Sequence, residues 1–272
     1  MQFINLAGHD MAYKRSGQPQ GETMVCVHGI TTYSFVWQDV IPYFEQDYDV
    51  ICIDLLGCGA SDMPLDVSYS IQAHAERLHD FLCALNILKS HLLGHDLGGG
   101  IAQIFAIQHE PMLKTLTLIN TVGYDYWPVQ PITALRTPII RQLLMGALDL
   151  GMFKLIIHQG VFHRHKITHA LIEQFWQPLR TKEGRKAFMH FARCLDNQDL
   201  MMMVEKLKQL SVPTIIFRGD SDPFLTATIA ERLHADIANS QLHRIQTASH
   251  FLMIDEPEWL AKHWLAGVRS QA

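Results

Sequence analysis

The chain has 272 residues and a formal net charge of −5, with 48% hydrophobic and 18% charged residues. This composition supports a large buried core and excludes a disordered chain. The acidic balance argues against nucleic acid or an anionic membrane as a partner, because both select basic surfaces. Five cysteines, an odd number, favour buried free thiols over a disulfide framework. With no visible secretory signal and no apolar run long enough to span a bilayer, we expect a cytoplasmic protein.

Apolar runs that stop at glycine or at polar residues predict the strands of a sheet. In chain order they cover residues 24–27, 50–53, 91–93, 116–119 and 213–217, with a weaker run at 241–245. Their hydrophobicity is continuous rather than alternating, which is typical of strands covered on both faces in a parallel sheet. Helical patterns over 71–88 and 101–107 lie between them. We therefore predict an α/β fold with a mostly parallel central sheet flanked by helices.

The character of the chain changes after Trp127. From residue 128 to about residue 210 no strand pattern is present, and the segment is helical and rich in Leu, Ile, Met and His. We predict an α/β core formed by residues 1–127 and 210–272. Residues 128–209 would form a helical cap inserted into that core, with a pocket between the two.

One short motif has the form of a strained turn between a strand and a helix. Gly94-His95-Asp96-Leu97-Gly98-Gly99 follows a predicted strand and opens a helix. It resembles the G-x-nucleophile-x-G elbow, whose flanking glycines are needed because larger side chains would clash in the turn. The segments Gly219–Pro223 and Ala248–Phe251 follow the last two predicted strands, in the order acid then histidine. His28-Gly29-Ile30 ends an early strand, where such enzymes build half of an oxyanion hole.

Together these segments resemble the branch of the α/β-hydrolase fold that contains haloalkane dehalogenases, haloacetate dehalogenases and epoxide hydrolases. The resemblance covers residues 3–264 and is helped by residues 54–62 and 250–258, while the cap matches only in position and length. It implies an Asp96 nucleophile, a His250 base oriented by Asp222, and an oxyanion hole formed by the N–H groups of Ile30 and Leu97. It implies no cofactor and no metal, and the partner would be a small-molecule substrate. The candidate substrate contacts are His28, Trp127 and Phe251, and the oligomeric state is left open.

An aspartate in the elbow favours a particular reaction class. A carboxylate with an ordinary pKa of about 3.9 is already ionised at neutral pH and can attack an sp³ carbon without a base. Displacement of a halide or opening of an epoxide would leave an alkyl ester of Asp96. His250 would then activate a water molecule against that ester. Attack on an ester substrate would instead give an anhydride, a poorer route.

The side chains that bind the leaving group in these relatives are missing. Leu97 and Ile30 occupy the positions where haloalkane dehalogenases carry halide-binding Trp and Asn. Haloacetate dehalogenases have arginines after the nucleophile, whereas this chain has Leu97 and Gly100. Thr31 replaces an epoxide hydrolase proline, and no Tyr follows Pro128. The cap instead offers histidines as proton donors: His158, His163, His165, His169 and His190.

Several alternatives stay open. Asp220 is a second candidate for the acid, while Asn120, at the other position where relatives place it, cannot ionise. His95 is expected to be structural and to point away from the site, and His163-x-His165 is interpreted as cap surface rather than a metal site. Asp96 could act as a base or polar contact in a hydrolase or lyase of an ester, lactone or C–C substrate. A non-catalytic small-molecule receptor is the alternative from another class.

Overall fold

The computed structural model describes residues 1–30, 32–127 and 150–270. Eight strands form one sheet in the order β1-β2-β4-β3-β5-β6-β7-β8. β1 and β2 pair antiparallel, as do β2 and β4, and all later pairs are parallel. The strands are β1 (Gln2–Leu6), β2 (His9–Gly17), β3 (Glu22–Val27), β4 (Tyr48–Ile53), β5 (Ser90–Asp96), β6 (Leu113–Thr121), β7 (Thr214–Gly219) and β8 (Ser240–Ile245).

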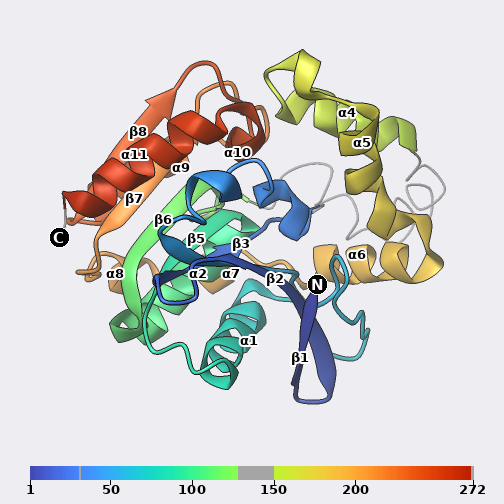
Figure 1. Ribbon diagram of the computed structural model, residues 1–272, viewed down its shortest axis with the longest axis horizontal. Helices are drawn as coiled ribbons and strands as arrows, with labels where there is room; N and C mark the ends of the chain where they lie inside the picture. The colour runs from blue at the N-terminus through green and yellow to red at the C-terminus, as the bar shows by residue number, and fades with distance from the viewer. Residues whose placement is uncertain (31, 128–149, 271–272) are drawn as a thin grey trace.

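The prediction of a mostly parallel α/β sheet is confirmed, and each of the six predicted runs is a strand. The sequence patterns missed the β1–β2 hairpin, which projects from one edge of the sheet (Figure 1). Most β1 side chains are exposed. An exposed edge strand lacks the continuous apolar run by which the central strands were found.

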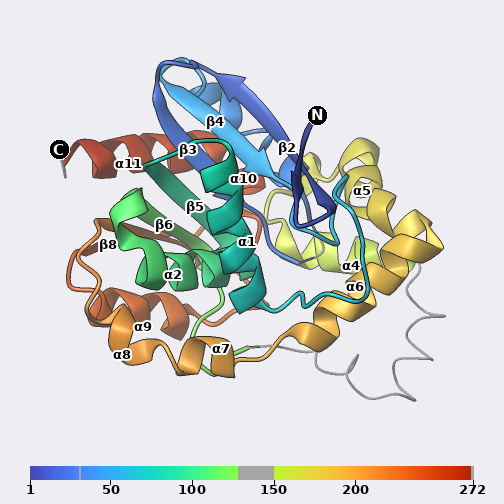
Figure 2. The same ribbon diagram turned by 90° about the horizontal axis from the view of Figure 1, so that it is seen from below.

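Helices cover both faces of the sheet. α1 (Ile71–Ala84), α2 (Leu97–His109) and α9 (Ala227–Asp236) lie on one face, and α11 (Pro257–Arg269) lies on the other (Figure 2). The predicted helix 71–88 ends earlier, since Asn86 has a positive φ of 56° that turns the chain. The short 3₁₀ helices are η1 (Ser34–Trp37), η2 (Ile41–Tyr43), η3 (Glu110–Met112), η5 (Arg164–Lys166) and η6 (Gln177–Arg180).

A helical insertion separates β6 from β7, and its described part, residues 150–210, contains no strand. Its helices are α4 (Leu150–Gly160), α5 (His169–Trp176), α6 (Lys182–Cys194), α7 (Gln198–Met201) and α8 (Val204–Leu207). α4, α5 and α6 stand at one end of the molecule (Figures 1 and 2), whereas α7 and α8 pack near α2 (Figure 2). Residues 128–149 of the predicted cap lie outside the described residues. No helix in the described ranges is long and apolar enough to cross a membrane.

A buried carboxylate joins the insertion to the core. Asp255, in α10 (Leu252–Asp255), accepts hydrogen bonds from the backbone N–H groups of Phe162 at 2.9 Å and His163 at 3.1 Å. It also accepts one from Ser249 at 2.9 Å, on the loop that carries His250. One side chain therefore fixes the position of the insertion relative to that loop.

Candidate active site

Asp96 occupies a strained turn at the end of β5, where α2 begins. Its φ of 54° and ψ of −120° are rare for a residue with a side chain. The neighbouring glycines permit this geometry. A Cβ on Gly94 would collide with the Gly98 backbone, and one on Gly98 would collide with the Val27 carbonyl. The predicted elbow therefore has the required shape.

The Asp96 carboxylate is buried between backbone donors. The N–H of Ile30 donates to Oδ2 at 3.0 Å, and the N–H of Leu97 also bonds to the carboxylate. Burial raises the pKa of Asp96 to about 6, against the opposing influence of His250 and these two N–H groups. The two groups predicted to form the oxyanion hole thus already face the side chain on which an oxyanion would develop.

His250 contacts Asp222 rather than Asp220. Its Nδ1 lies 3.0 Å from Asp222 Oδ2, and the N–H groups of Phe224 and Leu225 donate to Asp222 Oδ1 at 2.8 and 3.2 Å. Burial raises the pKa of Asp222, but His250, its hydrogen bond and the donors around it outweigh burial and lower the pKa. Asp220 instead accepts from Arg244 Nε at 2.8 Å. The geometry distinguishes the two candidate acids that the sequence left open.

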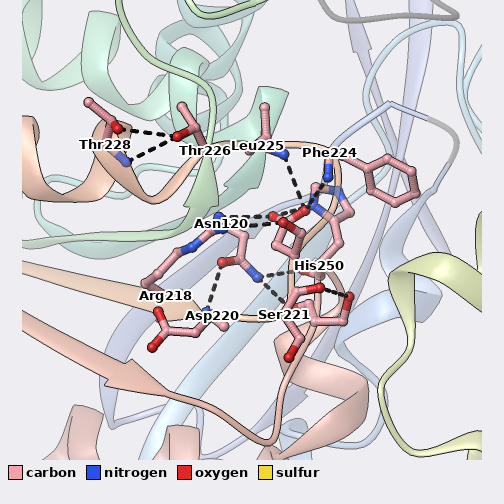
Figure 3. Close-up of polar contacts among 12 residues, drawn as sticks. Asn120, Arg218, Asp220, Ser221, Phe224, Leu225, Thr226, Thr228 and His250 are labelled. Atoms are coloured by element: carbon pink, nitrogen blue, oxygen red, sulfur yellow. Dashed lines mark hydrogen bonds and ion pairs between the residues drawn. The ribbon is translucent and has the colours of Figure 1, made fainter.

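Asn120 ties the loops of the site together, a role that the sequence reasoning did not find. Its Nδ2 donates to the carbonyl oxygens of Ser249 and His250, each at 2.8 Å. Its Oδ1 accepts from the N–H of Gly219 at 3.0 Å. Figure 3 shows Asn120 among the polar residues around His250. The available signal was a polar residue near the carboxyl end of a buried strand, where parallel sheets place their functional groups.

His28, predicted as a substrate contact, is held by backbone groups. His28 is fully buried, and its Nε2 accepts from the N–H of Leu55 at 2.9 Å. Its Nδ1 lies 2.7 Å from the carbonyl oxygen of Gly29. Both ring nitrogens of His28 are therefore engaged by backbone groups. His95 is also buried, and its Nε2 lies 3.0 Å from the His250 carbonyl.

The two predicted aromatic contacts are both buried. Phe251 packs its ring 4.9 Å from that of His250 and 5.0 Å from that of Phe175 in α5, measured between ring centroids. It thus lies between the site and the insertion. Trp127 is 2% exposed, at the start of the segment outside the described residues.

An apolar hollow lies between the core and the insertion, beside Ile30. The core contributes Ile30, Thr32 and residues 57–59, and the insertion contributes Phe175, Pro178, Leu179, Gly184, Phe188 and Phe191. The only titratable group in this lining is the Cys58 thiol, whose pKa is raised by burial. The described lining of this hollow therefore contains no charged side chain.

None of the insertion histidines lines the hollow. His190 Nε2 lies 2.7 Å from the carbonyl oxygen of Val67, and His163 Nε2 lies 2.9 Å from Glu256. The remaining insertion histidines, at 158, 165 and 169, are exposed. Over the described ranges, no three His, Cys, Asp or Glu side chains are arranged to hold a metal ion.

A family model and several known proteins are similar to this chain in sequence. The family model described as alpha/beta hydrolase fold matches residues 22–143. The 2-hydroxy-6-oxo-6-(2'-aminophenyl)hexa-2,4-dienoic acid hydrolase of Metapseudomonas resinovorans is 26% identical over 275 residues, covering 99% of this chain and 91% of its own. Epoxide hydrolase 3 of Xenopus tropicalis is 25% identical over 268 residues, covering 92% of this chain and 72% of its own.

A solved structure agrees with these relatives. Haloalkane dehalogenase DbeA from Bradyrhizobium elkani USDA94 superposes with a TM-score of 0.87 at 19% identity, covering 100% of this chain and 99% of the other. At that identity the likeness concerns the fold alone. The relatives named above are hydrolases, which goes against the receptor alternative. Its sheet, its elbow and these relatives make the chain a hydrolase of the α/β-hydrolase fold.

Proposed function

We propose that the chain is a cofactor-independent hydrolase in which Asp96 attacks an electrophilic alkyl carbon and His250 then activates water against the resulting ester. The observation that carries the proposal is a buried carboxylate in the elbow, hydrogen-bonded to Ile30 and close enough to His250 for their charges to interact. Residues 128–209 would act as the cap that closes the pocket.

In the first step Asp96 must be ionised. With a pKa of about 6, it is mostly a carboxylate at neutral pH. One carboxylate oxygen forms a bond to the substrate carbon, while the bond from that carbon to a halide or to the epoxide oxygen breaks. A halide leaves with the electron pair, and an alkoxide formed from an epoxide takes a proton from water.

In the second step His250 acts as the base. Burial lowers the pKa of His250, but Asp222 and then Asp96 outweigh it, and the pKa is raised above its ordinary value. Ester formation removes the negative charge of Asp96, so His250 then loses its proton more readily. The neutral ring takes a proton from water as the oxygen of that water attacks the Asp96 carbonyl carbon. The oxyanion faces the N–H groups of Ile30 and Leu97, and its collapse restores the carboxylate and releases an alcohol.

The lining of the hollow supports an uncharged, apolar substrate. A carboxylate on the substrate would lose its hydration there and would find no cationic partner among the described lining residues. A small epoxide or haloalkane is uncharged and apolar and has an electrophilic carbon. Each class is named in one of the similar proteins.

Intact-protein mass spectrometry of His250→Ala tests the proposal. The variant is incubated with a panel of epoxides and haloalkanes, and it should accumulate the Asp96 ester because its hydrolysis lacks the base. An epoxide adds its whole mass, whereas a haloalkane adds its alkyl group less one hydrogen, so the increment identifies the class. The matched control, His250→Ala with Asp96→Asn, should form no adduct. An adduct that persists in this control, or that maps to another residue, would contradict the proposed nucleophile.

A second candidate is a hydrolase or lyase in which Asp96 acts as a base or polar contact. The Metapseudomonas relative favours it, as does a pKa of about 6, which suits a base near neutral pH. Single turnover in ¹⁸O-water separates the two. A covalent route places the label in the Asp96 carboxylate and leaves the first product unlabelled, whereas a base mechanism labels the product directly.

A further inference from the structure

A buried arginine lies directly behind the acid of the site. Arg218, in the buried strand β7, is 3% exposed. Its Nη1 donates to Asp222 Oδ2 at 3.2 Å, and its Nη2 donates to the Asp222 backbone carbonyl at 3.3 Å. A buried guanidinium is costly unless it is paired, so this placement makes Asp222 its principal partner.

Arg218 and His250 share one oxygen atom. Asp222 Oδ2 accepts from Arg218 Nη1 and lies 3.0 Å from His250 Nδ1, while Oδ1 accepts from two backbone N–H groups. The Asp222 side chain is fully buried, so water does not screen these contacts. The positive charge of Arg218 therefore weakens the attraction between the Asp222 carboxylate and a protonated His250.

We propose that Arg218 is a positioning residue of this site, which fixes Asp222 for its bond to His250 and draws off part of the negative charge that Asp222 presents to the imidazole. In this arrangement Asp222 orients His250 without holding a proton on the ring too tightly. The effect of Arg218 on turnover rests on the proposed function, whereas its effect on the pKa of His250 does not.

The other groups around His250 make the effect of Arg218 separable. The charged groups acting on His250 are Asp222, Asp96 and Arg218. The His95 ring, 4.7 Å away, has a pKa lowered well below its ordinary value by burial and is neutral. Of these charges only Arg218 lowers the pKa of His250, adding to the effect of burial.

The groups facing Arg218 supply a control. They are Asp222, Asp220 and Arg244. Arg244 pairs with Asp220 and Glu231 at the surface and makes no hydrogen bond with Asp222 in the described structure. Arg244→Met therefore removes a nearby cation without touching the acid of the site.

Titration of His250 by NMR in histidine-labelled protein, without substrate, is the decisive experiment. The His250 signal is assigned by its loss in His250→Ala. Arg218→Met should raise the pKa of His250, because it removes the cation that lowers this pKa. Arg218→Lys, which keeps the charge, and Arg244→Met should leave it close to the wild-type value. If Arg218→Met does not fold, Arg218→Gln keeps a donor without the charge and should shift the pKa in the same direction.

The pH dependence of hydrolysis of the Asp96 ester, followed in protein that retains His250, gives a second measurement. In Arg218→Met its acid limb should move to higher pH by the same amount, because His250 must be neutral to act as a base. An unchanged His250 pKa in folded Arg218→Met, or an equal shift in Arg244→Met, would overturn the inference. If no Asp96 ester forms in any variant, the proposed function fails, while the NMR titration still decides the role of Arg218.

Discussion

Replacement of Asp96 by asparagine should abolish ester formation and yet make the protein more stable at neutral pH. Burial raises the pKa of Asp96 from 3.8 to about 6, so the folded protein must keep an anion where a neutral group is preferred. The folded state then binds the proton more tightly than the unfolded state, and stability falls as pH rises from about 4 to about 6. A difference of about two pKa units at 1.36 kcal/mol each corresponds to about 3 kcal/mol at pH 7.

Urea unfolding of wild type and Asp96→Asn at pH 4, 6 and 8 measures this effect. Asp96→Asn should exceed wild type in free energy of unfolding by about 3 kcal/mol at pH 8, and the gap should nearly close at pH 4. The asparagine is nearly isosteric, and its Oδ1 can still accept from Ile30. A gap that does not change with pH, or a variant less stable than wild type at pH 8, would refute the argument from burial.

Asp222→Asn provides the opposite control in the same experiment. The pKa of Asp222 is lowered on folding, so its carboxylate contributes stability that is present above the ordinary pKa and is lost as pH falls through the folded value. Asp222→Asn should therefore be less stable than wild type at pH 8, with a gap that narrows on acidification. The two carboxylates thus have opposite effects on the free energy of unfolding: ionised Asp96 lowers it, and ionised Asp222 raises it.

Three further substitutions test other parts of the site. Asp255→Ala leaves backbone N–H groups of the insertion and of the His250 loop without their acceptor. In thermal unfolding it should lower the free energy of unfolding by about 1–3 kcal/mol for each unpaired group. The control Asp66→Ala, at an exposed position, should change this free energy little. Asn120→Ala removes the acceptor of the buried Gly219 N–H and should lower the free energy of urea unfolding by about 1–3 kcal/mol; an unchanged value would contradict its linking role. Gly29→Ala places a Cβ against Asp96 Oδ2 and should reduce kcat/KM roughly 100-fold while circular dichroism stays that of wild type.

Local patterns in the sequence were sufficient to predict the central sheet and the elbow. Continuous apolar runs predict buried parallel strands because both faces of such strands are covered. Glycines around Asp96 predict a tight turn, because only glycine leaves room for the close approach of Gly94 to Gly98 and of Gly98 to Val27. Each of these signals is contained within a few consecutive residues.

Only the tertiary structure decided which polar groups meet. The sequence favours Asp222 and leaves Asp220 as a second candidate, whereas in the folded chain Asp222 contacts His250 and Asp220 pairs with Arg244. The roles of Arg218 and Asn120 depend on backbone and side-chain groups that other strands and loops bring together, as with the bond from Asn120 to His250, 130 positions later. Hydrogen bonds of this kind are set by the packing of the folded chain, and no local periodicity records them.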